Sequence, residues 1–482
     1  MSLFEAVIGL EVHCQLATRT KIFCACPASP PRGESVADVP VNRSTCPVCA
    51  GHPGTLPVLN RQAVDYAVRA GLALGCEIHS RSQFSRKNYF YPDLPKGYQI
   101  TQFDSPVCGE GALAFSLPSG ERRTVRIQRI HLEEDAGKSV HAGTHSEVNL
   151  NRAGVPLIEI VSHPEMRTAE EAGAYLRALH AVVTWIEVCD GNMQEGNFRC
   201  DANVSIRPVG ATQFGTRVEV KNVNSFRFVE KAIAHEIERQ TAILKSGGSV
   251  QQETRGYDPD RDATFSQRGK EEAHDYRYFP EPDLPELTLA QAWVDQIRSE
   301  LPELPDQRRA RYEQELGLSP YDAGIVTSSR ELVRYFEEAT QLGASAKALA
   351  NLLAGEVSRL ANEKGTWLGS RLLPVHLADV VRELQAARIS ATAAKQLIGL
   401  AWESGERIAD LIELEGLAQV SDTRALEAWL DEVIAQSPGQ WSEFQSGKDK
   451  LIGFFTGQVM KKSGGKANPA LIQELIRKKV GS

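Results

Sequence analysis

The chain has 482 residues, which at roughly 100–200 residues per domain predicts two to four domains. Hydrophobic residues make up 42% and charged residues 24%, a balance that excludes a disordered, collagenous or disulfide-scaffold protein. The net charge of −8 provides no global attraction to nucleic acid or anionic membrane, so a polyanionic partner must meet a local basic patch.

The first predicted element is a strand over 4–14, in which apolar residues occupy the even positions. Glu11 and His13 occupy odd positions, so both project from the polar face. Acidic residues interrupt this segment and exclude a signal peptide, and no stretch approaches the ~18 apolar residues of a membrane helix. We therefore expect a cytoplasmic protein that makes no membrane contact.

Two close pairs of cysteines follow the first strand. They are Cys24 with Cys26 and Cys46 with Cys49. Four thiolates in two pairs match a tetrahedral zinc site, although one residue separates the first pair instead of the usual two. Such a zinc would be structural, because four cysteines leave no open coordination position. The alternative is a metal-free loop of buried free cysteines.

A segment over 85–98 interleaves the cations Arg86, Lys87 and Lys96 with aromatic residues. Cations beside stacking rings suit contacts with phosphates and bases. A packed loop whose lysine side chains lie along apolar surface is the alternative interpretation.

Three adjacent acids, Glu133, Glu134 and Asp135, end another alternating segment. Adjacent carboxylates repel one another unless a cation or solvent separates them. Neighbouring residues of a regular strand point to opposite faces, so the strand must bulge or end here if Glu133 and Glu134 serve one site.

Two helices in this part of the chain have clear N-terminal caps. Thr168 and Glu171 form a capping box ahead of an apolar helical face. Ser225 can cap a second helix that runs to Gly247 and Gly248. We expect both helices to be architectural.

Two further segments alternate as strands, 199–207 and 215–221. A hairpin that joins them would bring Asp201 and Asn203 near Glu219 and Lys221. A solvated outer sheet face is the ordinary explanation for such alternation. We favour a functional site, because the polar faces are rich in oxygen ligands with a histidine, the donor set that suits a divalent hard cation.

The composition changes beyond Pro285, after which runs rich in Ala, Leu, Glu and Arg have helical spacing. These runs are 345–362, 374–400, 449–462 and 469–479. We therefore predict an α+β protein with three domains. They are an antiparallel-sheet-rich α/β domain over 1–290 that carries the acidic faces and the cysteines and that the resemblance described below identifies as a cradle, an all-helical domain over 291–404 and a small helical tail over 405–482.

Common nucleotide-binding and nucleophile motifs are missing. The sequence at Gly137 and Lys138 lacks the upstream glycine of a P-loop, because position 132 is Leu132, and no G-x-G-x-x-G follows a strand. Cys14 adjoins His13 but lies on the opposite strand face, so we assign it to the core and not to a nucleophile. A nucleotide site in this chain would be of an uncommon type.

Seven long motifs occur in order along the chain. They are V-I-G-L-E-V-H at 7–13, S-R-K-N-Y-F-Y-P-D-L-P-K-G-Y-Q-I at 85–100, H-L-E-E-D-A-G-K at 131–138, N-R-A-G-V-P-L-I-E-I-V at 151–161, R-C-D-A-N-V-S at 199–205, V-E-V-K-N-V-N-S at 218–225 and D-Y-R-Y-F-P-E-P-D-L-P at 275–285. Together they resemble the B subunit of the tRNA-dependent aspartyl/glutamyl-tRNA amidotransferase, the GatB family. The similarity runs the whole length of the chain.

The resemblance implies a subunit of an ATP-dependent carbon–nitrogen ligase that converts misacylated Asp-tRNA(Asn), Glu-tRNA(Gln) or both to the amidated forms. This subunit is expected to use ATP and Mg²⁺ to phosphorylate the side-chain carboxylate of the tRNA-bound amino acid, after which ammonia displaces the phosphate. The cradle over 1–290 would then be the kinase domain. The implied partners are an amidase (A) subunit that supplies ammonia through a channel, a small C subunit that completes a heterotrimer, and misacylated tRNA. The resemblance also allows an association with the non-discriminating aminoacyl-tRNA synthetase.

The same resemblance implies site residues. The expected Mg²⁺ ligands are Glu11, His13, Glu133, Glu134 and Glu219. Lys221 is expected to act with them in catalysis, and the expected ATP or substrate contacts are Arg86, Lys87, Asp201 and Asn203. This assignment agrees with the chemistry, because transfer of a phosphoryl group to a carboxylate brings two anions together and requires a metal ion and fixed cations.

The tail reverses the sign of the charge. Residues 441–482 hold eight Lys and Arg against three acids, a local net charge of +5. The predicted tRNA contacts are Lys461, Lys462, Lys466, Arg477, Lys478 and Lys479. A solvated helical face is the alternative, because lysines at helix C-termini also complement the helix dipole.

Two other classes of function remain to be weighed. A non-catalytic RNA-binding scaffold conflicts with the carboxylates of the polar faces, which phosphates would repel without a metal. A free-standing amide ligase with its own glutaminase lacks a nucleophile signature. The sequence does not decide between Asp-tRNA(Asn) and Glu-tRNA(Gln) as substrates.

Overall fold

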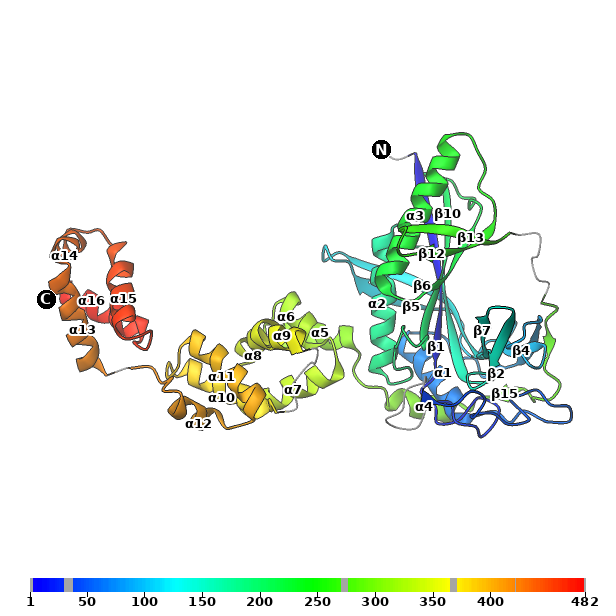
Figure 1. The fold of residues 1–482 in the computed structure, drawn as a ribbon, viewed down its shortest axis with the longest axis horizontal. Coiled ribbons are helices and arrows are strands. Elements are labelled where there is room, and N and C mark those ends of the chain that lie inside the picture. The colour runs from blue at the N-terminus through cyan, green and yellow to red at the C-terminus, as the bar shows by residue number, and fades with distance from the viewer. Residues whose placement is uncertain (1–2, 30–37, 270–275, 365–370, 421, 481–482) are drawn as a thin grey trace. The chain divides into compact units, whose positions relative to one another are not determined.

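The computed structural model describes residues 3–29, 38–269, 276–364, 371–420 and 422–480. The chain divides into two compact units, Met1–Asp306 and Gln307–Ser482. The first unit is built around one large sheet and the second from helices (Figure 1). The predicted α+β class is confirmed.

An 11-stranded sheet organises the first unit, with the strand order β13-β12-β11-β10-β1-β9-β6-β4-β3-β14 and β5 paired with β6. Its strands are β1 (Phe4–Gln15), β3 (Phe84–Asn88), β4 (Tyr98–Gln102), β5 (Gly111–Ser116), β6 (Arg122–Glu134), β9 (Pro156–Ser162), β10 (Phe198–Pro208), β11 (Val218–Val223), β12 (Glu253–Asp258), β13 (Ala263–Gly269) and β14 (Phe279–Pro280). Among these described strands β11 and β12 pair in parallel, and the other pairs are antiparallel. Two small sheets pair β2 (Arg81–Ser82) with β15 (Leu287–Thr288) and β7 (Lys138–Ala142) with β8 (His145–Asn149).

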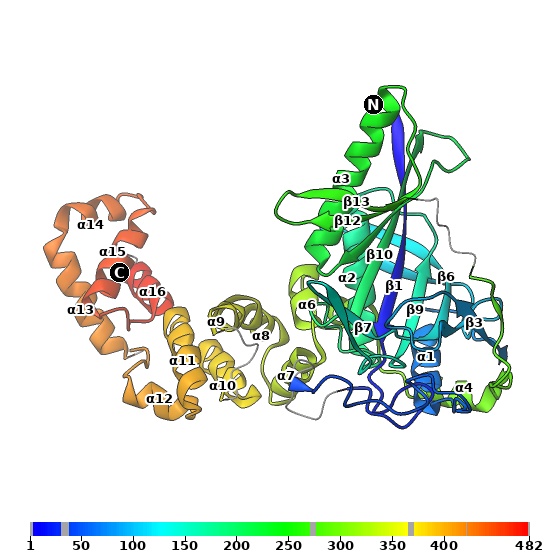
Figure 2. The ribbon, with the colours of Figure 1, turned by 45° about the vertical axis from the view of Figure 1, so that its right-hand side comes forward.

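Strand β1 lies near the middle of the sheet, between β10 and β9 (Figure 2). Its apolar positions, which include Leu10 and Val12, are buried, whereas the alternate positions Glu11 and His13 remain partly exposed. The predicted alternation is therefore confirmed, and Cys14 belongs to the core, as predicted.

Four helices accompany the sheet, α1 (Arg61–Ala73), α2 (Ala169–Trp185), α3 (Phe226–Lys245) and α4 (Gln291–Ser299). Both predicted N-caps are confirmed: the Thr168 side chain accepts a hydrogen bond from the Glu171 backbone N–H, and the Ser225 side chain accepts one from Phe228. The reciprocal bond of the predicted capping box differs, because the Glu171 carboxylate accepts from the Arg167 N–H at 2.8 Å and not from that of Thr168. Helices α2 and α3 pack against each other, and α3 lies against β10. Among the described residues, no helix is long and apolar enough to cross a bilayer.

An ionic network fixes α3 to strands β12 and β13. The fully buried carboxylate of Glu236 accepts hydrogen bonds from Arg239 at 2.9 Å and from Thr264 at 2.5 Å, and it lies 3.0 Å from Nε of Arg255. Burial alone would raise the pKa of Glu236, but the hydrogen bonds from Arg239, Thr264 and Gln240 outweigh it and lower the pKa. The network therefore holds α3 against β12, the strand that pairs with β11.

The second unit is helical. Its helices are α5 (Pro305–Glu315), α6 (Pro320–Val326), α7 (Arg330–Gln341), α8 (Ala346–Leu352), η3 (Leu353–Val357), α9 (Ser358–Lys364), α10 (Pro374–Gln385), α11 (Ala391–Ser404), α12 (Ile408–Leu414), α13 (Thr423–Gln436), α14 (Pro438–Gln445), α15 (Leu451–Lys462) and α16 (Pro469–Val480). Buried residues form one apolar core between Tyr312 and Leu411 and another between Leu426 and Ile476. The predicted boundary at 404 falls at the end of α11, ahead of the last residues of the first core. The three-domain division stays a prediction.

Candidate active site

A continuous row of polar side chains crosses five neighbouring strands of the sheet. In the strand order β11, β10, β1, β9 and β6, this polar row consists of Glu219, Lys221, Asp201, Asn203, Glu11, His13, Glu159, His131 and Glu133. The antiparallel register aligns its members, because Glu11 pairs with Asp201, and His13 pairs with Glu159. Residues distant in the sequence thereby share one surface.

One end of the polar row gathers ligands that suit a divalent cation. Nε2 of His13 lies 3.3 Å from Oε2 of Glu159. One ligand atom from each of His13, Glu133 and Glu159 lies within 4.8 Å of the others. We call these three residues the cation cluster. Two carboxylates and one imidazole fit a hard or borderline divalent cation.

Charges around the cation cluster keep its acids ionised. Burial would raise the pKa of Glu133, but Lys87 and the hydrogen bond from His131 lower it. Burial opposes ionisation of Glu159 as well, but His131 and His13 hold its pKa well below the usual range. The same acids raise the pKa of Lys87 against its own burial. At neutral pH the two carboxylates of the cluster are therefore charged and lie beside a fixed ammonium group.

The other end of the polar row is an ion-pair cluster. Nζ of Lys221 donates to Oδ2 of Asp201 at 2.9 Å and lies 3.0 Å from Oε1 of Glu219. Asn203 donates through Nδ2 to Oε1 of Glu11 at 2.9 Å. The predicted approach of Asp201 and Asn203 to Glu219 and Lys221 is confirmed. Burial and the neighbouring acids raise the pKa of Glu11.

A cleft of about 460 Å³ lies along the polar row. His13, Glu133, Asp201 and Lys221 line it, together with Lys87. Its walls also include Tyr89, Asp135, Arg152 and Arg199. The cleft thus has anionic ligands for a metal and cationic groups for an anionic substrate.

A second cavity of about 270 Å³ lies beside Glu11 and Asn203. Its apolar lining includes Val7, Leu10, Pro164 and Phe214, and its polar lining includes Ser162, Ser205 and Arg217. Oδ1 of Asn203 is buried and has no hydrogen-bond partner among the described residues. A buried acceptor without a donor is costly, and it marks this wall as a place for a ligand or water.

Two predicted site residues lie apart from the polar row. β6 ends at Glu134, whose carboxylate accepts a hydrogen bond from the Ile100 backbone N–H at 2.8 Å and pairs with Lys96. Glu134 lines a separate cavity beside the cysteines, so it does not join Glu133 in the cation cluster. Arg86 donates to both carboxylate oxygens of Glu281 at 2.8 Å and does not line the cleft.

Glu159 was not predicted from the sequence. Every residue of β9 is buried, so its sequence does not alternate between apolar and polar residues. The alternation that identified the other site residues is therefore missing around Glu159. The position of Glu159 inside a continuous apolar run could have identified it as a site residue, because a buried carboxylate requires a cation or hydrogen-bond donors.

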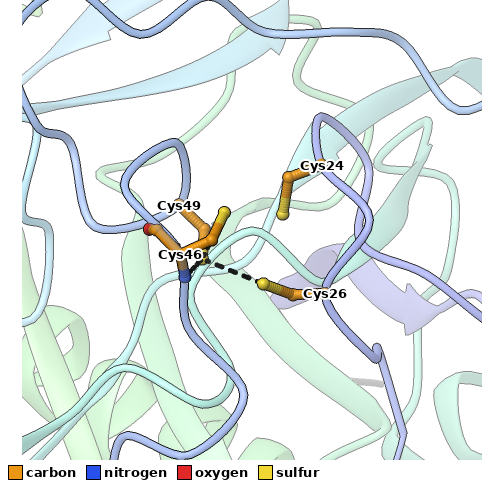
Figure 3. A group of neighbouring side chains, drawn as sticks. All are labelled: Cys24, Cys26, Cys46 and Cys49. Carbon is orange, nitrogen blue, oxygen red and sulfur yellow. Dashed lines mark hydrogen bonds between the residues drawn. The ribbon is translucent and has the colours of Figure 1, made fainter.

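The four predicted cysteines come together as one group, with all four Sγ atoms within 4.8 Å (Figure 3). Sγ of Cys49 lies 4.0 Å from Sγ of Cys26 and 3.9 Å from Sγ of Cys46. Zn–S bonds of about 2.3 Å place tetrahedral sulfur atoms about 3.8 Å apart, so this geometry is compatible with a structural zinc.

A buried cation supports the thiolate form of Cys49, one of the four cysteines. Nζ of the fully buried Lys21 lies 3.5 Å from Sγ of Cys49. The hydrogen bond from Cys24 has the largest effect on the pKa of Cys49, and the Cys46 backbone N–H and Lys21 lower this pKa further. The pKa falls to about 4 despite burial. The thiolate is the form of cysteine that binds metal.

The structure separates the predicted tail cations into two groups. Lys462 pairs with Glu432, and Nζ of Lys479 lies 2.5 Å from Oδ1 of Asp431. Both acids belong to α13, outside the segment whose charge was counted. The remaining predicted contacts are exposed. They are Lys461, Lys466, Arg477 and Lys478.

Comparison with known proteins gives a consistent result along the chain. Residues 6–295 match the GatB/GatE catalytic domain family, and residues 334–480 match the GatB domain family. The B subunit of the aspartyl/glutamyl-tRNA(Asn/Gln) amidotransferase of Geobacter sulfurreducens is 54% identical, with 99% of each chain covered. The proteins of that name from Geotalea uraniireducens and Solidesulfovibrio magneticus are 53% and 50% identical, with 99% and 100% of each chain covered. The chain therefore belongs to the GatB family of amidotransferase B subunits.

Proposed function

We propose that the first unit activates the side-chain carboxylate of an aspartyl or glutamyl group esterified to tRNA by phosphorylating it with ATP. The name shared by the relatives supports this substrate class. The observation that carries the proposal is the cation cluster in the cleft, with Lys87 beside it and Lys221 farther along the polar row.

The reaction has two steps. An oxygen of the substrate carboxylate bonds to the γ-phosphorus of ATP while the bond to the ADP oxygen breaks, which gives an acyl phosphate. Ammonia then attacks the acyl carbon, loses a proton, and expels inorganic phosphate to leave the amide. The first step brings two anions together, so its barrier depends on how well the site neutralises charge.

Each group of the cleft has a distinct part in the proposal. His13, Glu133 and Glu159 would hold Mg²⁺, which supplies neutralisation of phosphate charge. Lys87 contributes a fixed positive charge beside these ligands. Lys221, held by two carboxylates, is oriented to meet an anionic oxygen on the other side of the cleft. The proposed ligand set therefore keeps His13 and Glu133 from the prediction and adds Glu159. It leaves out the other predicted ligands, Glu11, Glu134 and Glu219.

We place the nucleotide base and ribose in the second cavity. Its apolar wall around Phe214 suits a purine ring, and the unpartnered Oδ1 of Asn203 can accept a hydrogen bond from an amino or hydroxyl group. Glu11 lines this cavity and belongs to the polar row, so phosphates would extend from the cavity toward the cation cluster. The substrate acyl group would then enter through the cleft.

The subunit name of the relatives supports an assembly of several different subunits. We propose that this chain works in the cytoplasm as part of a heterotrimer in which an amidase subunit releases ammonia from glutamine and a small third subunit completes the complex. The cysteine cluster would hold a structural zinc. The exposed cations Lys461, Lys466 and Arg477 would contact the tRNA backbone. Co-purification of the three subunits tests this assembly.

A nucleotide assay tests the activation step. The assembled enzyme, supplied with ammonium in place of glutamine, should release ADP from ATP only when misacylated tRNA is present. Correctly acylated Asn-tRNA(Asn) is the matched control, because it lacks the carboxylate and should stimulate no release. Equal ADP release with both tRNAs would contradict carboxylate phosphorylation.

A further inference from the structure

We infer that a cluster of aromatic rings beside the cleft binds the unpaired 3′ end of the tRNA by stacking on its terminal base. The cluster, which we call the ring platform, consists of Tyr89, Phe103, Tyr276 and Tyr278. This inference rests on the proposed function and adds to it a binding site for the nucleotide that carries the substrate amino acid.

The ring platform is a connected set. Phe103 and Tyr278 stack face to face with ring centroids 3.9 Å apart and an angle of 4° between their planes. Tyr276 bridges to Tyr278 at 6.0 Å and to Tyr89 at 5.8 Å, both edge to face. The rings come from loops that follow β3 and β4 and from the segment before β14, so distant parts of the chain build one surface.

The ring platform is continuous with the cleft. Tyr89 and Lys87 both line the cleft, and Nζ of Lys87 lies 5.9 Å from the Tyr89 ring centroid and 5.2 Å from that of Tyr276. A cation at this distance from ring faces is attracted to them, and it also attracts a phosphate or a base. The platform is therefore a combination of rings and positive charge that suits single-stranded nucleic acid.

Covalent connection limits where the end of the tRNA can lie. The amino acid is esterified to the terminal ribose, so the ribose and the aminoacyl group join the base of that nucleotide to the carboxylate that is phosphorylated. When the carboxylate reaches the cation cluster, the terminal base therefore lies within the length of this linkage, a distance that includes the edge of the cleft. Tyr89 extends the ring platform to that edge.

The platform has an accessible ring face. Phe103 keeps 45% of its surface exposed although Tyr278 covers one side of its ring. An exposed aromatic ring with one face covered and the other open is the arrangement on which a base stacks.

The rings are not required to hold the backbone in place. The segment that carries Tyr276 and Tyr278 is fixed by hydrogen bonds from Asn88, whose N–H donates to the Tyr276 carbonyl at 2.9 Å and whose Nδ2 donates to the Arg277 carbonyl at 2.8 Å. β14 then pairs with β3. Because these contacts already anchor the segment, the stack of Phe103 on Tyr278 has no evident structural necessity.

Substitution of Phe103 in the assembled enzyme tests the inference. Phe103→Ala should raise the KM for misacylated tRNA about tenfold, because loss of base stacking on an aromatic ring weakens binding by at least that order. The KM for ATP and the thermal stability should not change. Phe103→Leu keeps an apolar side chain without a π face and should behave like the alanine variant, whereas Phe103→Trp should retain tight binding.

The matched control is Phe265→Ala. Phe265 is exposed to the same degree, 46%, but lies on β13 at the opposite edge of the same sheet. This variant should leave every kinetic constant unchanged. An equal rise in the KM for tRNA in both variants would overturn the assignment of the ring platform.

A chemically charged tRNA whose terminal nucleotide lacks its base makes the test specific. With the unsubstituted enzyme this substrate should show the same tenfold rise in KM, and combination with Phe103→Ala should add nothing further. Additive losses would show that Phe103 acts elsewhere and would overturn the inference. If the unsubstituted enzyme fails to amidate intact misacylated tRNA, the proposed function itself is wrong, which is a distinct result.

Discussion

The two ligand clusters of the first unit are built in opposite ways. The cysteine cluster takes four identical ligands from two short segments, 24–26 and 46–49, and Lys21 lies beside one of them, Cys49. The cation cluster takes one residue from each of three strands, β1, β6 and β9, and two of the three line an open cleft. A closed thiolate site can hold structure, whereas an open site of mixed ligands leaves room for substrate.

The charged groups around the two clusters also differ. In the cysteine cluster one buried ammonium group, that of Lys21, lies beside Cys49. In the cation cluster His131 and Lys87 offset the acids, and the cleft beyond has further cations, Arg152 and Arg199. The first arrangement has one cation beside one thiol. The second has several cations along an open wall, where the single carboxylate of Asp135 pairs with both Arg152 and Arg199.

The largest effect should come from breaking the cation cluster. Glu159→Gln removes a proposed metal ligand without changing its size, and amidated tRNA formation should fall by about a thousandfold or more because several kcal/mol of charge stabilisation are lost. Glutamine hydrolysis by the partner subunit should persist in part. The measurement is amidated tRNA formed by the assembled enzyme.

Glu147→Gln is the control for that variant, because Glu147 is an exposed acid on β8 and lies outside both clusters. It should amidate at the rate of the unsubstituted enzyme. Near-normal amidation by the Glu159 variant would mean that the polar row only solvates a sheet.

Loss of the cysteine cluster should lower the thermal stability of the protein more than it lowers the rate of amidation. Cys49→Ser should abolish zinc binding and reduce the melting temperature of the protein by several degrees, because a structural metal contributes directly to folding. Zinc content and thermal unfolding are the measurements. Cys76→Ser changes a buried thiol outside the cluster and should leave the zinc content intact. Absence of zinc from freshly purified, unoxidised protein would contradict the assignment.

A smaller effect should come from Glu236, a buried acid that belongs to neither cluster. Its folded-state pKa is depressed, so its charged form adds stability above the ordinary pKa of glutamate, and this stability is lost as the pH falls through the depressed value. Glu236→Gln should cost about 2 kcal/mol at pH 7. The difference from the unsubstituted protein should shrink below about pH 4.

Thermal unfolding across this pH range measures the effect. Glu238→Gln, two residues along the same helix and exposed, should change nothing at any pH. A cost for the Glu236 variant that stays constant down to low pH would show that packing, and not charge, explains the loss.

The smallest effect should come from the tail. Substitution of Lys461, Lys466 and Arg477 by glutamine should raise the KM for misacylated tRNA a few-fold and flatten its salt dependence, because each lost phosphate contact reduces the slope by about one. Lys448→Gln removes a cation that already pairs with Glu443 at 3.1 Å and serves as the control. An unchanged salt slope in the triple variant would assign these cations to an ordinary soluble surface.

The comparison of the two clusters also explains what the sequence could predict. The cysteines were found because their spacing is local, and Glu11 and His13 were found because β1 alternates between a buried and a polar face. Glu159 was missed because β9 is buried on both sides and has no alternation. The bonds from Arg86 to Glu281 also could not be predicted, because they join residues far apart in the sequence.

Local pattern therefore identifies a ligand that belongs to a short motif, whereas tertiary pairing decides which acids share one site. Glu133 and Glu134 illustrate the limit. The family resemblance assigned both to one metal site although neighbouring strand residues point to opposite faces, and the structure places them beside different cavities at the end of β6.

The most direct test is capture of the activated carboxylate with hydroxylamine. Hydroxylamine also cleaves the tRNA ester to an α-hydroxamate, so the product to measure is the hydroxamate of the aspartyl or glutamyl side chain. The assembled enzyme, given ATP and misacylated tRNA but no ammonia source, should form this side-chain hydroxamate, because hydroxylamine attacks an acyl phosphate readily. The Glu159→Gln variant should form none, and the Cys49→Ser variant should form it at temperatures where it stays folded. Hydroxamate formation by the Glu159 variant at the rate of the unsubstituted enzyme would contradict a kinase site at the cation cluster.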